Sequence, residues 1–242
     1  MKFYKIASAF KRAKSKLARQ PQIFVFGLVL YLSLIIFSQI SQRYNYLLAS
    51  PSAMLYFVSM GAIYIAILAY NLSGILTLAN SKSKGFKQML KDYFSGASKS
   101  FLKMFAALVL ITLVSFFVEE SAFAIAFVVG KALHFPVRAA QVLFISVYFA
   151  GLIGLLLFLT FVPVASVVGS RNFLSSIGQG IKFVKRNYLE SFVLVFAFSI
   201  TFLLVQYLPQ RIGEIVENII LVPIVSVFMV EFFLAGRKRG LG

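Results

Sequence analysis

Six long apolar runs, separated by charged segments, dominate this sequence and limit what it can fold into. They are close to the roughly 20 residues that cross the hydrocarbon core of a bilayer as a helix. Only 13% of the residues are charged, against about a quarter in soluble domains. We therefore expect an all-α integral membrane protein, a single domain over 1–242, with six transmembrane helices. The predicted spans cover about 22–40, 53–79, 103–118, 139–169, 190–209 and 213–236.

The apolar segment 121–130 does not fit this count of spans. It follows Glu119 and Glu120 and is too short to cross a bilayer alone. Two interpretations stay open for 121–134. It is an interfacial or re-entrant helix on the outer face, or it extends the third span.

The basic residues predict the orientation of the chain. Twenty of the 24 lysines and arginines fall on one side of the six-span arrangement, and the other side holds Arg43, Lys131, Arg138 and Arg211. Because basic residues accumulate in cytoplasmic loops, we expect a multi-pass plasma-membrane protein with both termini cytoplasmic. The net charge of +17 then lies at the inner side, which favours a membrane surface over nucleic acid as the partner.

Each inner basic segment carries apolar residues at spacings of three and four, which predicts a helix with one apolar stripe. Lys and Arg occupy the remaining face, as in helices that lie among lipid headgroups. The pattern predicts three repeats of an amphipathic helix followed by a two-helix hairpin, with units of about 1–80, 81–170 and 171–242. The stripes are Phe3, Ile6, Phe10, Ala13, Leu17; Phe86, Leu90, Tyr93, Ala97, Phe101; and Leu174, Ile177, Ile181, Val184, Tyr188.

A short motif occurs twice within the apolar runs. "FVPVASVV" (161–168) and "LVPIVSVF" (221–228) share a proline and a serine three residues later, Pro163 with Ser166 and Pro223 with Ser226. A proline inside a span removes one backbone donor and kinks the helix. The interpretations are a packing kink, which we favour, a gating hinge, or a contact with substrate.

Residues 161–198 resemble a known pattern of bacterial and archaeal six-helix membrane proteins. A returning span with Pro163 precedes a basic amphipathic helix that includes Ser175 and ends in Lys185, Arg186 and Asn187. This arrangement is similar to the membrane domain attached to some glycerophosphodiester phosphodiesterases and to its stand-alone relatives. The resemblance implies the six-helix fold. It does not carry over the phosphodiesterase activity, because this sequence has no such domain.

We expect no enzymatic site, no cofactor and no metal. The chain has no cysteine, which excludes disulfides and thiol chemistry. Its single histidine, His134, has no partner acid at helical spacing, so we expect an interfacial residue. No P-loop, zinc-binding HExxH or nucleophile elbow occurs. Glu119 and Glu120 fit a solvated helix end better than a cation site, and the pair Glu214 and Glu217 fits the start of an outer helix.

Glu231 is the only acid inside an apolar run. Intramembrane carboxylates are functional candidates by default. Arg237 and Lys238 follow within about two turns, so we favour pairing or snorkelling at the inner surface. If Glu231 faces the bundle interior instead, it is the best functional candidate.

The basic inner clusters have two interpretations: contacts with anionic lipid headgroups, or the positive-inside bias alone. The pairs Ala62–Ala66 and Ala150–Gly154 have the spacing of closely packed helices. The candidate lipid contacts are Lys5, Arg12, Lys16, Lys87, Lys91, Lys182, Lys185 and Arg186.

Our first functional hypothesis is a non-enzymatic protein that contacts lipids, a protein partner or a second copy of itself at the inner leaflet. The alternative is a transporter or permease-type subunit that moves a small or lipidic substrate between the repeats. A lipid-modifying enzyme ranks third, because the spans lack acid–base groups.

Overall fold

The computed structural model describes residues 4–44, 53–83, 85–169 and 172–237, and all regular structure within them is helical, which confirms the all-α class. In chain order the helices are α1 (Tyr4–Arg19), α2 (Ile23–Arg43), α3 (Ala53–Asn80), α4 (Phe86–Ala132), α5 (Val137–Leu159), α6 (Phe161–Val168), α7 (Phe173–Arg186), α8 (Tyr188–Val205), α9 (Gln210–Ile215), the π-helix η2 (Val216–Leu221) and α10 (Val222–Arg237).

The predicted number of spans is confirmed. Within the described residues, six helical stretches are long and apolar enough to cross a membrane: Ile23–Arg43, Ala53–Asn80, Phe86–Ala132, Val137–Val168, Tyr188–Val205 and Gln210–Gly236. Five of them lie within about five residues of the predicted boundaries. The third is far longer than predicted, because α4 continues without a break for 47 residues.

Segment 121–130 belongs to α4, so of the two interpretations the structure supports the extension of the third span. Glu119 and Glu120 are exposed on this helix and do not end it, since glutamate is a good helix former. A helix of this length measures about 70 Å, more than twice the roughly 30 Å of a hydrocarbon core.

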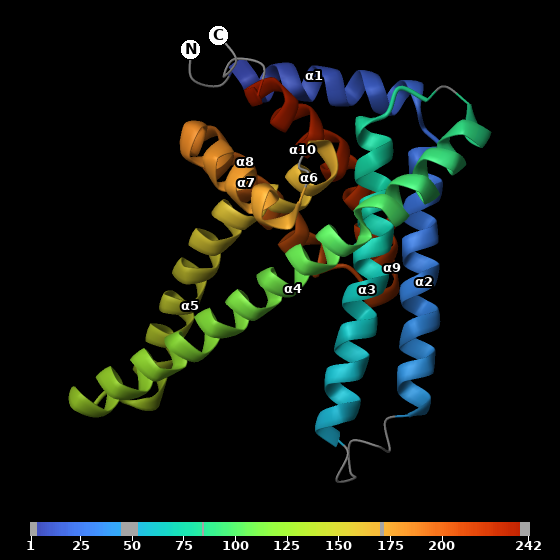
Figure 1. Cartoon of the computed structure of the whole chain (residues 1–242). Coiled ribbons are helices and arrows are strands. Elements are labelled where there is room, and N and C mark those ends of the chain that lie inside the picture. The colour runs from blue at the N-terminus through green and yellow to red at the C-terminus, as the bar shows by residue number, and fades with distance from the viewer. Residues whose placement is uncertain (1–3, 45–52, 84, 170–171, 238–242) are drawn as a thin grey trace.

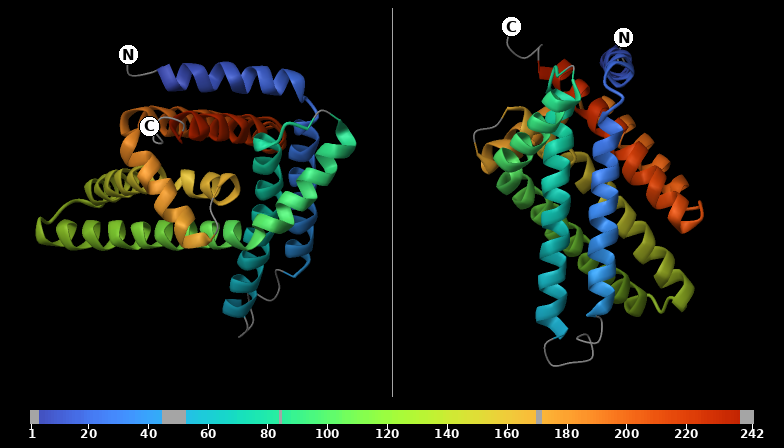
Figure 2. Two further views of the ribbon diagram at one scale, coloured as in Figure 1. Left: turned by 45° about the horizontal axis from the view of Figure 1, so that its top comes forward. Right: turned by 90° about the vertical axis from the view of Figure 1, so that its right-hand side faces the viewer.

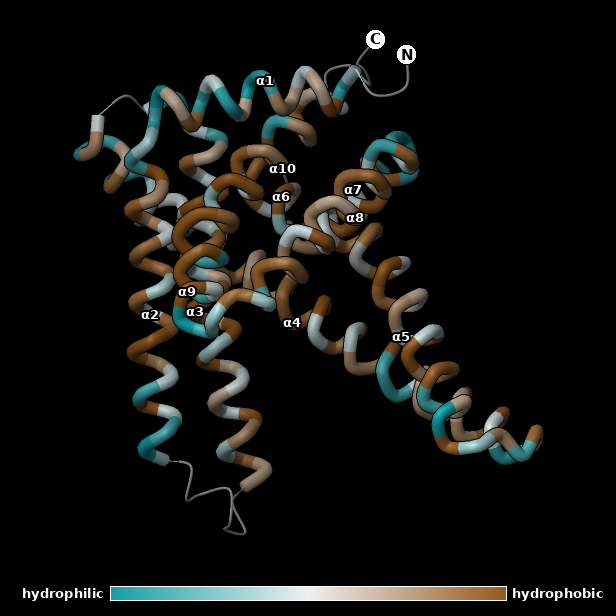
Figure 3. The backbone as a smooth tube through the Cα atoms, turned by 180° about the vertical axis from the view of Figure 1, so that it is seen from behind, coloured by the Kyte–Doolittle hydropathy of each residue, from teal (hydrophilic) through white to brown (hydrophobic). Residues whose placement is uncertain are grey.

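Helix α1 lies across one end of the molecule, above the other helices (Figure 1). The end of α10 and the start of α4 lie at this same end, which we call the α1 end. From there the pair α2–α3, the pair α4–α5 and the arm formed by α8 to α10 diverge toward the splayed end (Figure 2). Hydrophilic residues gather along α1 and at the tips of the hairpins, with mainly hydrophobic residues between them (Figure 3).

The core lies at the α1 end. Most of its residues come from the first half of α2, the second half of α3, the first half of α4, and from α6, α7 and α10, with further ones from α1, α5 and α8; they include Phe26, Ile75, Tyr93, Phe161, Val184 and Phe232. Toward the splayed end, large apolar side chains are exposed, among them Met54, Phe57, Phe117 and Phe127. Such surfaces suit contact with lipid chains rather than with water.

Tyr93 joins α3 and α4 in this core. Its ring stacks on Phe26 with centroids 4.5 Å apart, and its hydroxyl donates to Asn71 Oδ1 at 2.6 Å. The ring lies directly against Gly74, where any Cβ would collide with it, and Gly96 gives the same close approach to Thr77. Glycine is therefore required where these two helices touch.

The close contact between α4 and α5 uses different small residues from those predicted. Ala122, Ala126 and Gly130 are buried on α4. The predicted pairs are wrong: Ala62 and Ala150 are exposed, and a Cβ at Gly154 would meet nothing within 4 Å. The physical reason is that the hairpins diverge here, so those faces have no neighbouring helix.

The threefold repeat is not confirmed. The first and third basic segments form separate helices, α1 and α7, which end before Pro21 and at Asn187. The middle segment is the first part of α4. Its sequence offers no proline to end the helix before the span, and Gly96 stays helical against Thr77. The middle unit therefore lacks the bend that the other two share.

We expect Gly74→Ala to lower the free energy of unfolding by about 1–3 kcal/mol, as overpacking does in close-packed cores. The Tyr93 ring cannot yield, because Phe26 and Asn71 hold it and it is 1% exposed. Gly154→Ala is the matched control, and because its Cβ meets nothing it should raise the value by up to about 1 kcal/mol through helix propensity alone. The measurement is unfolding by SDS in mixed micelles, followed by circular dichroism. Equal effects at both glycines would contradict the packing described here.

Candidate functional site at the α1 end

Helix α1 is held by three cationic side chains that reach three different elements. Lys5 Nζ donates to Asn187 Oδ1 at 2.5 Å and lies 3.4 Å from Glu190 Oε2, at the junction of α7 and α8. Arg12 pairs with Glu231 on α10, and Lys16 contacts the end of α3. The spacings of seven and four residues place these cations on one face of α1. A single helix thus fastens elements that are far apart in the sequence.

The pair of Arg12 and Glu231 forms two contacts. Arg12 Nε lies 3.0 Å from Glu231 Oε2, and Arg12 Nη2 donates to the Glu231 backbone carbonyl at 3.2 Å. The Glu231 side chain is 15% exposed and the Arg12 side chain 43%. Of the two interpretations of Glu231, the structure places it in a pair near the surface. The partner comes from α1, 219 residues away, and not from the end of α10, where the Arg237 side chain and Lys238 lie outside the described residues.

Lys16 is bound by backbone carbonyls. Its Nζ donates to Ala79 O and, at 2.8 Å, to Ser81 O, both at the carboxyl end of α3. The exposed carbonyls of a helix end carry partial negative charge and favour a cation there. Burial lowers the pKa of the Lys16 ammonium group, while the Glu231 carboxylate favours its charged form. One turn further, Gln20 Nε2 donates to Ser83 O.

The contact face of α1 agrees with the predicted stripe at Ile6, Ala13 and Leu17 and departs from it at Phe10, while Phe3 lies outside the described residues. Ala13 of the stripe is 3% exposed and Ile6 and Leu17 pack against the core, together with Ala9, which lies outside the stripe, whereas Phe10 is 62% exposed. Its ring still contacts Phe228 on α10, with centroids 6.3 Å apart. The helix therefore packs through most of the predicted stripe and through Ala9, and Phe10 is left available to lipid.

A pocket of about 440 Å³ lies between α1 and the loop that joins α3 to α4; we call it the basic pocket. Its lining contains four cationic side chains and a single carboxylate. Arg19 and Lys82 are exposed and form no ion pair within the described part of the chain. The lining residues are Arg12, Ser15, Lys16, Arg19, Gln20, Ser81, Lys82, Ser83 and Glu231.

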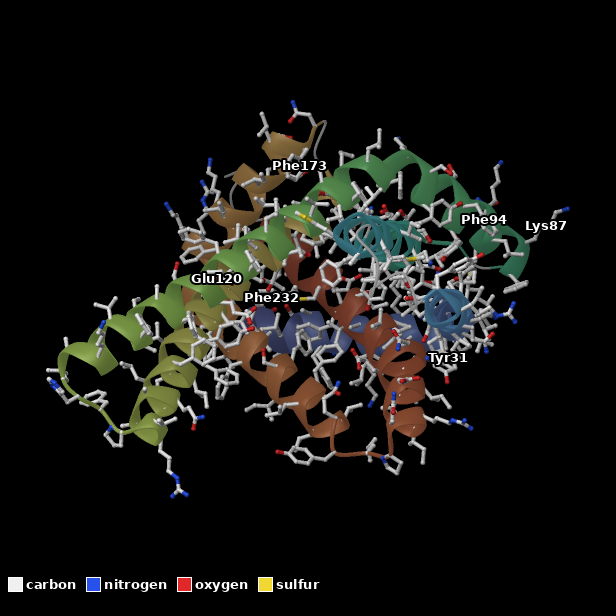
Figure 4. All side chains as sticks on the ribbon, turned by 90° about the horizontal axis from the view of Figure 1, so that it is seen from below. Tyr31, Lys87, Phe94, Glu120, Phe173 and Phe232 are labelled. Atoms are coloured by element: carbon white, nitrogen blue, oxygen red, sulfur yellow. The ribbon has the colours of Figure 1, made fainter. Side chains whose placement is uncertain are left out.

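The eight predicted lipid contacts divide into separate groups. Arg12 and Lys16 line the basic pocket, and Lys5 lies at the start of α8. Lys87 points away from the molecule at the beginning of α4 (Figure 4), and Lys91 is exposed one turn later. On α7 and at its end, three more are exposed: Lys182, Lys185 and Arg186. Sequence reasoning missed Arg19, Lys82 and the serines that complete the pocket, because α1 and the α3–α4 loop meet only in the fold.

The two Pro-Ser motifs stand at irregular helix positions. The helix breaks at Thr160, between α5 and α6, three residues before Pro163. The π-helix η2 ends at Leu221, two residues before Pro223. Ser166 Oγ donates to Val162 O at 2.9 Å inside the core, and Ser226 is also buried. Their role as hinge or substrate contact stays a prediction.

His134 ends α4. It has a positive φ of 52°, and the next residue, Phe135, donates its N–H to Gly130 O at 2.8 Å. This is the Schellman arrangement of a helix end, in which His134 occupies the position usually taken by glycine. Among the described residues no group of three or more His, Cys, Asp or Glu side chains is placed to hold a metal ion.

No protein-family model, no curated protein and no solved structure matches this chain.

A double-mutant cycle tests the attachment of α1. Arg12→Gln and Glu231→Gln should be coupled by about 1 kcal/mol in the free energy of unfolding, a value kept low because Arg12 is partly exposed to solvent. Lys14 is the control, since it is exposed on α1 and forms no ion pair among the described residues. Lys14→Gln and Glu231→Gln should add within about 0.5 kcal/mol. Additivity of Arg12→Gln and Glu231→Gln would show that the pair does not hold α1.

Proposed function

We propose that this protein is a non-enzymatic, multi-pass plasma-membrane protein that binds anionic lipid headgroups of the inner leaflet in the basic pocket. The observation that carries the proposal is the convergence of Arg12, Lys16, Arg19 and Lys82 on one pocket that contains a single carboxylate. A phosphate group there gains several charge-assisted hydrogen bonds at once.

The donors of the pocket favour a phosphate. Glu231 neutralises Arg12, which leaves Arg19 and Lys82 to pair with an incoming anion. An arginine fork matches two phosphate oxygens. Lys16 has three N–H donors, of which two bind the carbonyls of Ala79 and Ser81, so one remains. Ser15 also lines the pocket, whereas the hydroxyls of the lining residues Ser81 and Ser83 already donate to Leu78 O and to the Asp92 carboxylate.

The position of the pocket also favours a lipid. It lies beside the amphipathic helix α1 and next to the ends of spans α2 and α3, the level at which headgroups lie in a bilayer. Anionic lipids attract each nearby Lys or Arg by about 1 kcal/mol. A free phosphate lacks acyl chains and gains no such anchoring in the membrane.

A permease-type function finds less support. At the α1 end the space between α6, α7 and α10 is filled by phenylalanine rings. Phe183 lies 4.7 Å from Phe161, 5.3 Å from Phe232 and 4.9 Å from Phe233, measured between centroids. A substrate that crossed here would have to displace this aromatic cluster, at the cost of close packing in the core.

Lipid binding should depend on the two unpaired cations of the pocket. The double variant Arg19→Gln, Lys82→Gln should bind phosphatidylglycerol roughly 25-fold more weakly, about fivefold for each cation. Native mass spectrometry at increasing lipid concentration measures the affinity. Lys131→Gln with Arg138→Gln is the matched control, because it removes the same charge from exposed residues elsewhere. Equal losses of lipid affinity in both variants would show that only the net charge matters, and would contradict binding in the basic pocket.

The orientation can be tested because the chain contains no cysteine. Ala7 is exposed on α1, and Leu133 is 60% exposed between α4 and α5. In intact cells a membrane-impermeant maleimide should label Leu133→Cys, and label Ala7→Cys only after permeabilisation, as the distribution of Lys and Arg requires. The reverse pattern would place the basic pocket at the outer leaflet.

A further inference from the structure

A second pocket, of about 660 Å³, lies between α2, α3 and the part of the arm that consists of α9 and η2, which we call the α9–η2 arm. We call this pocket the acidic pocket. It lies on the side of the splayed end, and Tyr31 stands between α2 and this arm (Figure 4). Its lining residues are Leu30, Tyr31, Leu34, Ile35, Phe37, Ser38, Gln39, Ser41, Gln42, Tyr64, Leu68, Leu72, Glu214, Glu217, Asn218 and Val222.

The charge of this lining is entirely negative. Glu214 and Glu217 contribute carboxylates, and no lysine or arginine lines the pocket. Among the described residues each carboxylate accepts a long amide hydrogen bond, Glu214 from Gln210 at 3.2 Å and Glu217 from Gln206 at 3.3 Å. Within the described ranges neither forms an ion pair. Both acids lie in the first two turns of the stretch Gln210–Gly236, near the membrane surface, where a cationic group of a lipid or of a soluble amine can reach them.

The remainder of the pocket is an elongated apolar surface. It follows α2 from Gln42 to Leu30, about 18 Å at the rise of a helix. Leucines of α2 and α3 form its floor, and the rings of Phe37 and Tyr64 lie 5.7 Å apart at its side. Aromatic faces add attraction for a cation. The pocket therefore has a charged part and an apolar part, and a ligand that fits it should have both as well.

The fold closes the pocket toward the α1 end. Leu30 is 1% exposed, and Phe26, one turn further along α2, belongs to the core. At Gly27 the backbone of α2 comes so close to η2 that a Cβ would lie 2.7 Å from Asn218 O. The π-helix, a turn type frequent at functional sites, thus forms one wall of a blind pocket.

We propose that the acidic pocket binds an amphipathic organic cation, with its ammonium group at Glu214 and Glu217 and its alkyl chain along the leucines. A metal ion fits less well, because no cluster of three ligating side chains occurs among the described residues. A neutral lipid chain would leave both carboxylates without a counter-charge. The same ammonium chemistry is offered by a free alkylamine and by phosphatidylethanolamine.

The chain has no tryptophan, so Tyr31→Trp adds a unique fluorescent reporter to the lining of the pocket. In this background dodecylamine should change the indole emission in a saturable way, and dodecanol, which has the same chain without the charge, should not. Glu214→Gln with Glu217→Gln should weaken the dodecylamine response at least tenfold. The matched control is Glu119→Gln with Glu120→Gln, which removes the same charge from exposed residues of α4 and should leave the response unchanged.

Equal responses to dodecylamine and dodecanol, or equal losses in the two glutamine variants, would overturn the proposal. If Glu214→Gln with Glu217→Gln fails to fold, Leu68→Trp, made in the chain without the reporter, tests the same point by filling the floor while both carboxylates remain. This variant should no longer bind radiolabelled dodecylamine. Full binding by the variant would overturn the proposal. Nanodiscs containing phosphatidylethanolamine identify the source, since the lipid competes with dodecylamine only if it is the ligand.

Discussion

The attachment of α1 to the ends of three separate segments is the constraint on which the rest of this structure depends. Lipid chains are as apolar as leucine, so burial from water does not drive spanning helices together. Polar contacts and close packing must do so instead. Lys5, Arg12 and Lys16 provide such contacts to α8, α10 and α3. Tyr93 and the phenylalanine cluster provide the packing at the same end. Away from α1 the hairpins diverge.

This arrangement leaves two pockets of opposite charge on opposite sides of the core. The basic pocket forms where α1 meets the α3–α4 loop, and the acidic pocket forms where α2 and α3 meet the α9–η2 arm. The segment from α9 to α10 contributes to both, through Glu214 and Glu217 at one end and Glu231 at the other. Pro223 and the π-helix lie between them. This one segment therefore carries carboxylates of both pockets.

Hydropathy was sufficient to predict the helical class and the six spans, because the requirement for paired backbone groups in lipid leaves few alternatives. The partners of α1 were beyond such reasoning, since Arg12 and Glu231 are separated by most of the chain. The two glutamates at 119 and 120 suggested the end of a span, yet glutamate continues a helix readily when it is exposed. The acidic pocket was missed because Gln39 and Tyr64 approach Glu214 only through tertiary structure. The resemblance to the phosphodiesterase-linked membrane domain stays a prediction.

The two Pro-Ser motifs show why a repeated sequence did not predict a repeated structure. A proline lacks the N–H that would bind the carbonyl four residues earlier. In lipid this carbonyl needs another partner, and local changes of helix geometry can supply one. Before Pro163 the chain breaks the helix at Thr160, whereas before Pro223 it widens into η2. The break lets α6 turn into the aromatic core, and the widening forms a wall of the acidic pocket. One motif thus has two structural outcomes, each chosen by the helices that surround it.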